Sequence, residues 1–179
     1  MTLTPTAYVI LGMIRLGKTT GYEIKQLVDV SARFFWSASY GQLYPELRRL
    51  EEQGLIRGKD DATNGRARRE YELTEKGEEA LDGWLRSDEP LTLEMRDEGL
   101  LKLFFSDSLE PEKQLELIRA MRDHHQGIVD QLNAVEPGAR EKGGGPYRVL
   151  RYGLRVHSSY VEGFDDLEKE LQAEYGVVA

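Results

Sequence analysis

The chain of 179 residues contains no cysteine, which excludes disulfide bonds and thiolate metal sites and is typical of a reducing compartment. No apolar run approaches the roughly 20 residues that a membrane-spanning helix needs. The first residues also lack the basic start and apolar core of a secretory signal. We therefore expect a soluble cytoplasmic protein that has no membrane partner.

Catalytic motifs are missing as well. The sequence has no Gly-x-Ser-x-Gly element, no cysteine nucleophile and no glycine-rich phosphate loop that follows a predicted strand. Residues 17–20, Gly-Lys-Thr-Thr, resemble the end of such a loop, but the segment before them is not a predicted strand, so we interpret them as a turn. His125 and His157 have no carboxylates at metal-ligand spacing. We expect no enzyme activity, no cofactor and no metal site.

Acidic residues are concentrated in the second half of the chain. Residues 1–87 contain 13 Lys/Arg and 13 Asp/Glu, whereas residues 88–179 contain 11 and 19 and account for the whole net charge of −8. A neutral first half with clustered arginines can still bind phosphate, because the local potential matters more than the total charge. We therefore expect two domains, 1–87 and 88–179.

The apolar pattern of the first half predicts three helices, a β-hairpin and a fourth helix, which is the order of a winged helix-turn-helix. Thr4 is suited to cap the first helix, with Pro5 at its first position, and Ser37 or Ser39 is suited to cap the third. The Asn-Gly pair at 64–65 is a strong turn signal between the strands. The expected elements are helices at 4–16, 22–30, 39–54 and 74–85, and strands at 55–59 and 69–74.

The third helix carries the strongest functional signal. Leu43, Leu47 and Leu50 recur at helical spacing and predict a buried stripe. A helix that packs by one stripe and exposes polar and basic groups fits the major groove of DNA. The alternative for Tyr44 is that its ring packs against Tyr22. The residues predicted to bind DNA are Tyr22, Lys25, Gln42, Tyr44, Arg48, Arg66, Arg68 and Arg69.

The wing of the predicted winged helix is basic. Arg66, Arg68 and Arg69 cluster beside the hairpin turn. Basic arms of this kind contact phosphate groups or the minor groove of nucleic acids. The alternative is a solvated hairpin whose cations are offset by Asp60 and Asp61.

The second half is predicted to be helical, with an apolar helix at 98–105, a long helix from Pro111, a flexible break at 136–146 and a last helix at 147–175. Apolar residues in the two long helices alternate at spacings of three and four, which is the seam of a coiled coil or bundle. Each seam needs a partner surface, and we expect a second copy of the chain to supply it. The seam residues are Ile118, Met121, His125, Ile128, Leu132 and Val135 in the first helix, and Tyr147, Leu150, Leu154, His157, Val161, Phe164 and Leu171 in the second.

His125 and His157 interrupt these apolar seams, and Trp36 lies in an aromatic-rich connection before the third helix. A functional interpretation places the three in a pocket for a small aromatic effector, since aromatic rings stack on flat ligands and histidine titrates near neutral pH. The other interpretation is that the histidines fix the register of a bundle and that Trp36 is a core or domain-junction residue. The sequence leaves both interpretations open.

Three segments of the first half, at 21–24, 41–56 and 71–77, resemble the PadR-like family of bacterial transcription regulators. The second half is similar to the longer branch of that family at 101–107. The resemblance implies an N-terminal winged helix, a helical C-terminal dimerisation region and, in many members, repression that an effector relieves. The run Arg-Ala-Arg-Arg-Glu-Tyr at 66–71 departs from the Arg-Pro-Arg-Lys-Tyr-Tyr-like run that is common in the wing of the family.

The predicted fold is mainly α with a small β-hairpin, in which an N-terminal winged helix-turn-helix precedes a C-terminal α-helical dimerisation domain. The expected function is that of a homodimeric DNA-binding transcription regulator. We expect it to bind a palindromic double-stranded DNA operator, to repress a nearby operon and to be released by a small-molecule effector. The alternative is a winged-helix adaptor for protein interactions that does not bind DNA.

Overall fold

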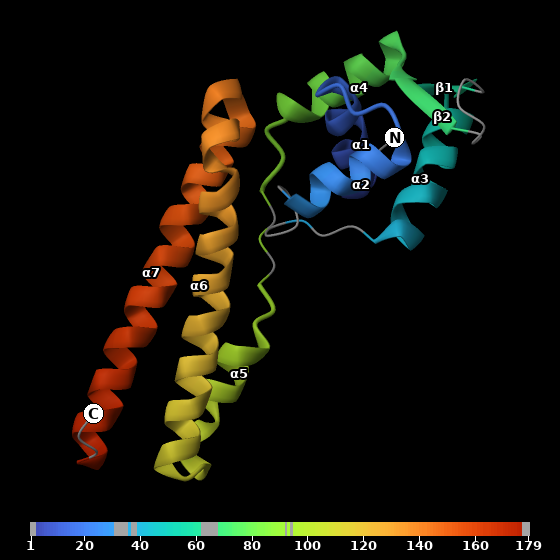
Figure 1. Ribbon diagram of the computed structural model, residues 1–179. Coiled ribbons are helices and arrows are strands. Elements are labelled where there is room, and N and C mark those ends of the chain that lie inside the picture. The colour runs from blue at the N-terminus through green and yellow to red at the C-terminus, as the bar shows by residue number, and fades with distance from the viewer. Residues whose placement is uncertain are drawn as a thin grey trace. The chain divides into compact units, whose positions relative to one another are not determined.

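The chain folds into two compact units, Met1–Leu91 and Thr92–Ala179. The boundary expected from the sequence, after residue 87, lies a few residues earlier. The computed structural model is mainly helical with one antiparallel hairpin, which confirms the predicted fold class (Figure 1). It describes residues 3–30, 36, 39–61, 68–91, 93 and 95–176, with the backbone alone at Val30, Tyr40, Asp61 and Arg68.

Within its described residues, the first unit has the element order that the sequence predicts. Thr4 caps the first helix, because its side chain accepts a hydrogen bond from the backbone N–H of Ala7 at 3.1 Å. Thr74 caps the fourth helix in the same way through Gly77. The bounds are α1 Pro5–Arg15, α2 Gly21–Val30, α3 Tyr40–Glu52, β1 Ile56–Asp61, β2 Arg68–Leu73 and α4 Glu75–Leu85.

One apolar core fills the first unit. Leu43, Leu47 and Leu50 of α3 have no exposed surface, which confirms the predicted stripe. They pack with apolar residues of α1, α2 and the hairpin, so that burial on one side of α3 decides which of its side chains reach solvent. The other large side chains buried almost completely in this core are Ile10, Leu11, Ile24, Val28 and Ile56.

The hairpin is joined to its neighbours at both ends. The turn at 17–20 adds to its edge, because the carbonyl of Thr19 accepts a hydrogen bond from the backbone N–H of Tyr71 at 2.7 Å. At the other end, a Cβ at Gly77 of α4 would lie 2.0 Å from the carbonyl oxygen of Leu55. Only glycine allows α4 to approach the start of the hairpin this closely.

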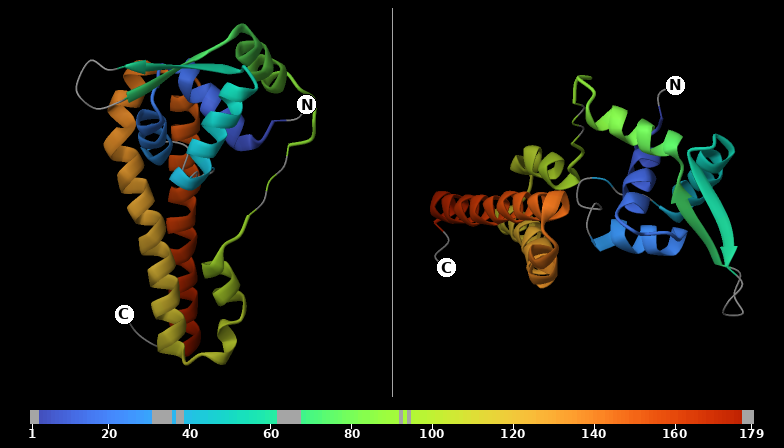
Figure 2. Two further views of the ribbon diagram at one scale, coloured as in Figure 1. Left: turned by 90° about the vertical axis from the view of Figure 1, so that its right-hand side faces the viewer. Right: turned by 90° about the horizontal axis from the view of Figure 1, so that it is seen from above.

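In the second unit, two long helices lie side by side in every view (Figures 1 and 2). A short helix precedes them and packs against the first of the two. In the described part of the chain, no helix has the length and apolar character that crossing a membrane requires. The bounds are α5 Glu98–Phe104, the 3-10 helix η2 Ser106–Ser108, α6 Pro111–Lys142 and α7 Gly144–Tyr175.

The flexible break predicted at 136–146 is wrong. Helix α6 continues through Pro137, and only Gly143, with a φ of +67°, separates it from α7. Glu136 stabilises the turn between α6 and α7, because its carboxylate accepts a hydrogen bond from the hydroxyl of Tyr147 at 3.1 Å. Proline and glycine disfavour a helix locally, but contacts between the two long helices outweigh that preference.

The two apolar seams pack against one another within a single chain, so their buried residues are covered without a second copy. Ile118 and Met121 of α6 form a buried cluster with Phe164 of α7. Further along, Nδ1 of His125 lies 2.9 Å from Nδ1 of His157. Since a single glycine reverses the chain, the two seams meet in one helical hairpin, and other faces are left for a partner.

Candidate nucleic-acid interface

Helix α3 exposes polar side chains opposite its buried stripe. It begins after Ser39, whose backbone N–H donates a hydrogen bond to Oε1 of Gln42 at 3.1 Å. Gln42 therefore caps the helix with its oxygen, while its Nε2 forms no hydrogen bond to a described residue. The amide donor remains at the N-terminal end of α3, where the helix dipole favours an anion.

Tyr44 of α3 lies against α2. A Cβ at Gly21 would lie only 2.9 Å from Cε1 of Tyr44, so the absence of a side chain at Gly21 permits this contact. The side chain of Tyr44 is nevertheless 43% exposed. The residue both packs against the second helix and presents part of its surface to solvent.

Arg48 is an exposed cation of α3. It forms no hydrogen bond or ion pair with any residue in the described part of the chain. The adjacent Arg49 differs, because its Nη1 lies 3.5 Å from Oε2 of Glu46 in a surface ion pair. The guanidinium of Arg48 is therefore available to a phosphate group or to a base edge.

The two candidates on α2 differ in accessibility. Tyr22 is 58% exposed, and its hydroxyl accepts a hydrogen bond from Nε2 of Gln26 at 2.7 Å. Lys25 forms an ion pair with Asp29, and only 13% of its side chain is exposed. Because its ammonium group already has a carboxylate partner, Lys25 is the weaker candidate for a phosphate contact.

In the wing, the structure gives the side chain of one predicted arginine. Arg66 lies outside the described residues, and Arg68 is described by its backbone alone. Arg69 forms ion pairs with Glu51 at 2.5 Å and with Asp60 at 2.6 Å. The guanidinium that the sequence assigns to DNA is thus held by two carboxylates of its own unit.

Glu51, in the last turn of α3, is a residue that the sequence analysis missed. Its Oε1 also accepts a hydrogen bond from the backbone N–H of Gly58 at 3.0 Å. Hydrogen bonding from Arg69 holds the pKa of the Glu51 carboxyl below its usual range, and Glu51 and Asp60 in turn raise the pKa of Arg69. The signal in the sequence was Gly58, since a glycine inside a strand indicates the close approach of another group.

The three effector candidates are divided between the two units. Trp36, in the first unit, is exposed. His125 and His157 form their pair inside the second unit, where the His125 ring stacks on Tyr160 with 4.4 Å between ring centres. Burial, followed by the neighbouring His157, lowers the pKa of His125, and burial also lowers the pKa of His157. This geometry agrees with the interpretation that both histidines pack inside the helical bundle.

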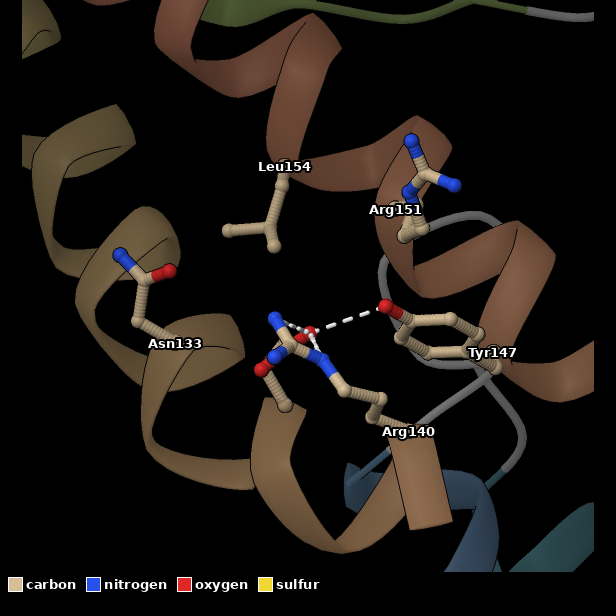
Figure 3. Close-up of a pocket in the computed structure, with 6 residues that line it drawn as sticks. Asn133, Arg140, Tyr147, Arg151 and Leu154 are labelled. Carbon is tan, nitrogen blue, oxygen red and sulfur yellow. Dashed lines mark hydrogen bonds and ion pairs between the residues drawn. The ribbon is translucent and has the colours of Figure 1, made fainter. Parts of the chain in front are cut away.

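A hollow of about 540 Å³ opens where the end of α6 meets the start of α7 (Figure 3). Glu136 accepts hydrogen bonds there from Arg140 at 2.9 Å and from Tyr147 at 3.1 Å. Cζ of Arg151 lies 6.0 Å from the centre of the Tyr147 ring. The hollow was not expected from the sequence, which predicts a flexible break in this segment. The lining residues are Asn133, Glu136, Arg140, Tyr147, Arg151 and Leu154.

Comparison with known proteins identifies the family. Residues 10–83 match the Transcriptional regulator PadR-like family, and residues 95–172 match the family Virulence activator alpha C-term. The negative transcriptional regulator PadR of Bacillus subtilis (strain 168) is 30% identical over 170 residues, which cover 89% of this chain and 93% of that protein. The chain belongs to the PadR-like family of transcriptional regulators. This membership confirms the resemblance seen in the sequence, and the family consists of regulators and not of enzymes.

Solved PadR structures share the fold of the whole PadR-like chain. The crystal structure of B. subtilis PadR in complex with operator DNA has a TM-score of 0.85 and 25% identity, and the match covers 96% of this chain and 99% of that one. The crystal structure of the same protein in complex with p-coumaric acid has a TM-score of 0.72 and 27% identity, with 93% and 98% covered.

The histidine pair predicts a pH-dependent stability. The folded-state pKa values of His125 and His157 lie below the ordinary value of 6.5, so the unfolded chain takes up protons first as the pH falls. The free energy of unfolding should therefore decrease between about pH 7.5 and 5.5, where histidines titrate and carboxylates remain charged. Urea unfolding at both pH values measures this decrease.

Two variants identify the source of that pH dependence. His157→Asn should reduce the decrease, because one of the two imidazoles with a lowered pKa is removed. His124→Asn is the comparison, since His124 is exposed beside the pair and, as a smaller cause of the lowered pKa values than burial, should reduce the decrease less. An equal decrease in wild type and His157→Asn would show that the pair does not cause it.

Proposed function

We propose that this PadR-like protein is a homodimeric regulator in the cytoplasm that binds a palindromic operator and represses a nearby operon. The observation that carries the proposal is the position of Arg48. Its exposed guanidinium has no ion-pair partner among the described residues, and it projects from a helix whose opposite face is buried. B. subtilis PadR, which shares this fold, has been solved with operator DNA.

In this proposal, the N-terminal part of α3 enters the major groove. Gln42 and Arg48 face base edges, since amide and guanidinium groups form paired hydrogen bonds with bases. The hydroxyls of Tyr22 and Tyr44 donate to phosphates and set the register of the domain on the duplex. The remaining cations of α2 and the wing add attraction that does not depend on sequence. These cations are Lys25, Arg66 and Arg68.

Arg48→Ala should weaken operator binding by about 1–3 kcal/mol, because one base or phosphate contact is lost. Selection from genomic fragments and footprinting would supply the operator, and fluorescence anisotropy at several salt concentrations would measure the affinity. Leu47→Ala is the contrasting variant, since a cavity in the core should lower the free energy of unfolding by about 2–5 kcal/mol. Arg48→Ala should change that free energy by no more than about 0.5 kcal/mol.

The same measurement separates the regulator from the adaptor. A regulator loses affinity steeply as salt rises, because bound cations release the counterions of DNA. If no genomic fragment is selected and Arg48→Ala does not change the weak affinity for DNA, a winged-helix adaptor that binds proteins is favoured instead.

The charge of α7 supports the homodimer. Its first half, 144–157, contains three arginines and no acidic residue, whereas its second half, 158–175, contains six acidic residues and one lysine. Arg155 and Glu162 are exposed, lie seven residues apart on one face and form no ion pair with a described residue. Antiparallel pairing of two α7 helices would bring each Arg155 beside Glu162 of the partner subunit.

Exposed apolar side chains on and after α5 add area for the same assembly. Phe104 is 78% exposed, and its neighbours surround a groove of about 400 Å³. Contiguous apolar surface of this kind is typical of an interface. The exposed apolar residues are Leu101, Phe104, Phe105 and Leu109.

Arg155→Glu should weaken the dimer about tenfold or more at low salt, because like charges then face one another twice across a symmetric interface. Combining Arg155→Glu with Glu162→Arg should restore assembly, since the reversed pair is attractive again. Sedimentation equilibrium measures both. If Arg155→Glu alone assembles as well as the wild type, the interface lies elsewhere.

For release from DNA, we assign the effector to the class of small aromatic carboxylic acids. The supporting observation on a relative is the complex of B. subtilis PadR with p-coumaric acid. In this chain, the hollow at the α6–α7 turn presents the cation of Arg151 beside the ring of Tyr147 (Figure 3). A carboxylate and a flat ring complement these two groups. The His125–His157 pair is a poorer site, because its rings already contact one another and Tyr160.

p-Coumaric acid should lower operator affinity, and Arg151→Ala should weaken its binding roughly tenfold because a charge-assisted hydrogen bond is lost. Isothermal titration calorimetry measures the binding. Arg148→Ala is the matched control, since Arg148 is an exposed arginine one turn earlier that does not line the hollow. Equal binding by both variants and the wild type would place the ligand elsewhere.

A further inference from the structure

The base of the wing is tied to the end of α3 by three charged side chains from three elements. Arg69 of β2 contacts both carboxylate oxygens of Glu51 in α3, with Nη2–Oε1 at 2.5 Å and Nε–Oε2 at 3.3 Å. Its Nη1 contacts Oδ1 of Asp60 in β1 at 2.6 Å. We call these three residues the Glu51–Arg69–Asp60 cluster.

The backbone of β1 takes part in the same contact. The N–H of Gly58 donates to Oε1 of Glu51 at 3.0 Å. A Cβ at Gly58 would lie 2.5 Å from Nε of Arg69 and 2.7 Å from Oε1 of Glu51, so any other residue would displace the ion pair. Glycine usually destabilises a strand, and this close approach explains why one is present at position 58.

The cluster is poorly suited to bind a phosphate. Two carboxylates surround one guanidinium, so the local net charge is negative. The Nε, Nη1 and Nη2 atoms of Arg69 are already engaged with Glu51 and Asp60. Arg48, which lies on the same helix as Glu51, has no such partners among the described residues. Arg69 therefore differs in role from Arg48, although the sequence groups the two as DNA contacts.

We propose that Glu51 is a positioning residue for DNA binding, which acts through Arg69 and Gly58 to hold the two strands at the base of the wing at a fixed angle to α3. The inference rests on the proposed DNA-binding function. Strands that are already held against α3 lose less freedom when both elements contact DNA together, and this preorganisation raises affinity. Arginine is required because its planar fork matches both oxygens of the carboxylate, which a lysine ammonium cannot do.

Glu51→Gln tests the proposal by the sign of its effect. Removing an anion near DNA should strengthen binding if Glu51 has no other role, since it would otherwise repel phosphates. Loss of the positioning contact should instead weaken binding, on the order of tenfold. Glu52→Gln is the matched control, because Glu52 is the next residue of α3, is exposed and has no ion pair with a described residue. It should bind as tightly as the wild type or more tightly.

Arg69 variants separate positioning from a phosphate contact. Arg69→Gln and Arg69→Lys should both weaken binding, while the dependence of log affinity on log salt keeps its slope. A residue that contacts a phosphate would lower that slope by about one unit when removed and would be rescued by lysine. Hydrogen exchange of the amides in 56–61 should be faster in Glu51→Gln than in the wild type, with or without DNA.

Two results would overturn the proposal. One is a Glu51→Gln protein that binds as tightly as Glu52→Gln, and the other is a slope that falls by one unit in Arg69→Gln. If the wild type binds its operator and Arg48→Ala weakens it while the Glu51 variants do not, the positioning role alone fails. If the wild type binds no DNA, the proposed function fails, and the positioning role with it.

Discussion

Burial of the leucine stripe on α3 is the constraint on which the candidate DNA surface depends. Leu43, Leu47 and Leu50 have no exposed surface and pack into the core that α1, α2 and the hairpin share. Turning α3 about its axis would expose these leucines and bury a charged side chain, and both changes are unfavourable. The exposure of Arg48 and the meeting of Glu51 with the hairpin therefore follow from apolar packing.

Ion pairing then divides the basic residues of the first unit. Lys25 and Arg69 have carboxylate partners, whereas Arg48 has none among the described residues. A paired cation attracts a phosphate less, because the carboxylate beside it repels the same phosphate. Counting arginines in the sequence thus overestimates the number of cations without a carboxylate partner and overlooks the acidic Glu51, which connects the hairpin to the helix.

The second unit shows how far periodicity carries a prediction. The alternating spacing correctly predicts two long helices with apolar seams, but the density of glycine and proline wrongly predicts a long break between them. Only Gly143 separates the helices, and the two seams pack against one another. Consequently the hollow beside Tyr147 and the charged outer face of α7 become the surfaces of interest, and neither is visible from the seams alone.

The sequence by itself determined the order of the elements of the first unit, the cap at Thr4 and the buried face of α3. Each of these depends on residues within a turn or two of one another, where backbone geometry sets the neighbours. Only the tertiary structure decided which charged and polar side chains meet. Glu51 and Arg69 are 18 residues apart, and His125 and His157 are 32 apart. Such pairs form only after apolar burial has placed their elements side by side, and local sequence patterns do not predict that placement.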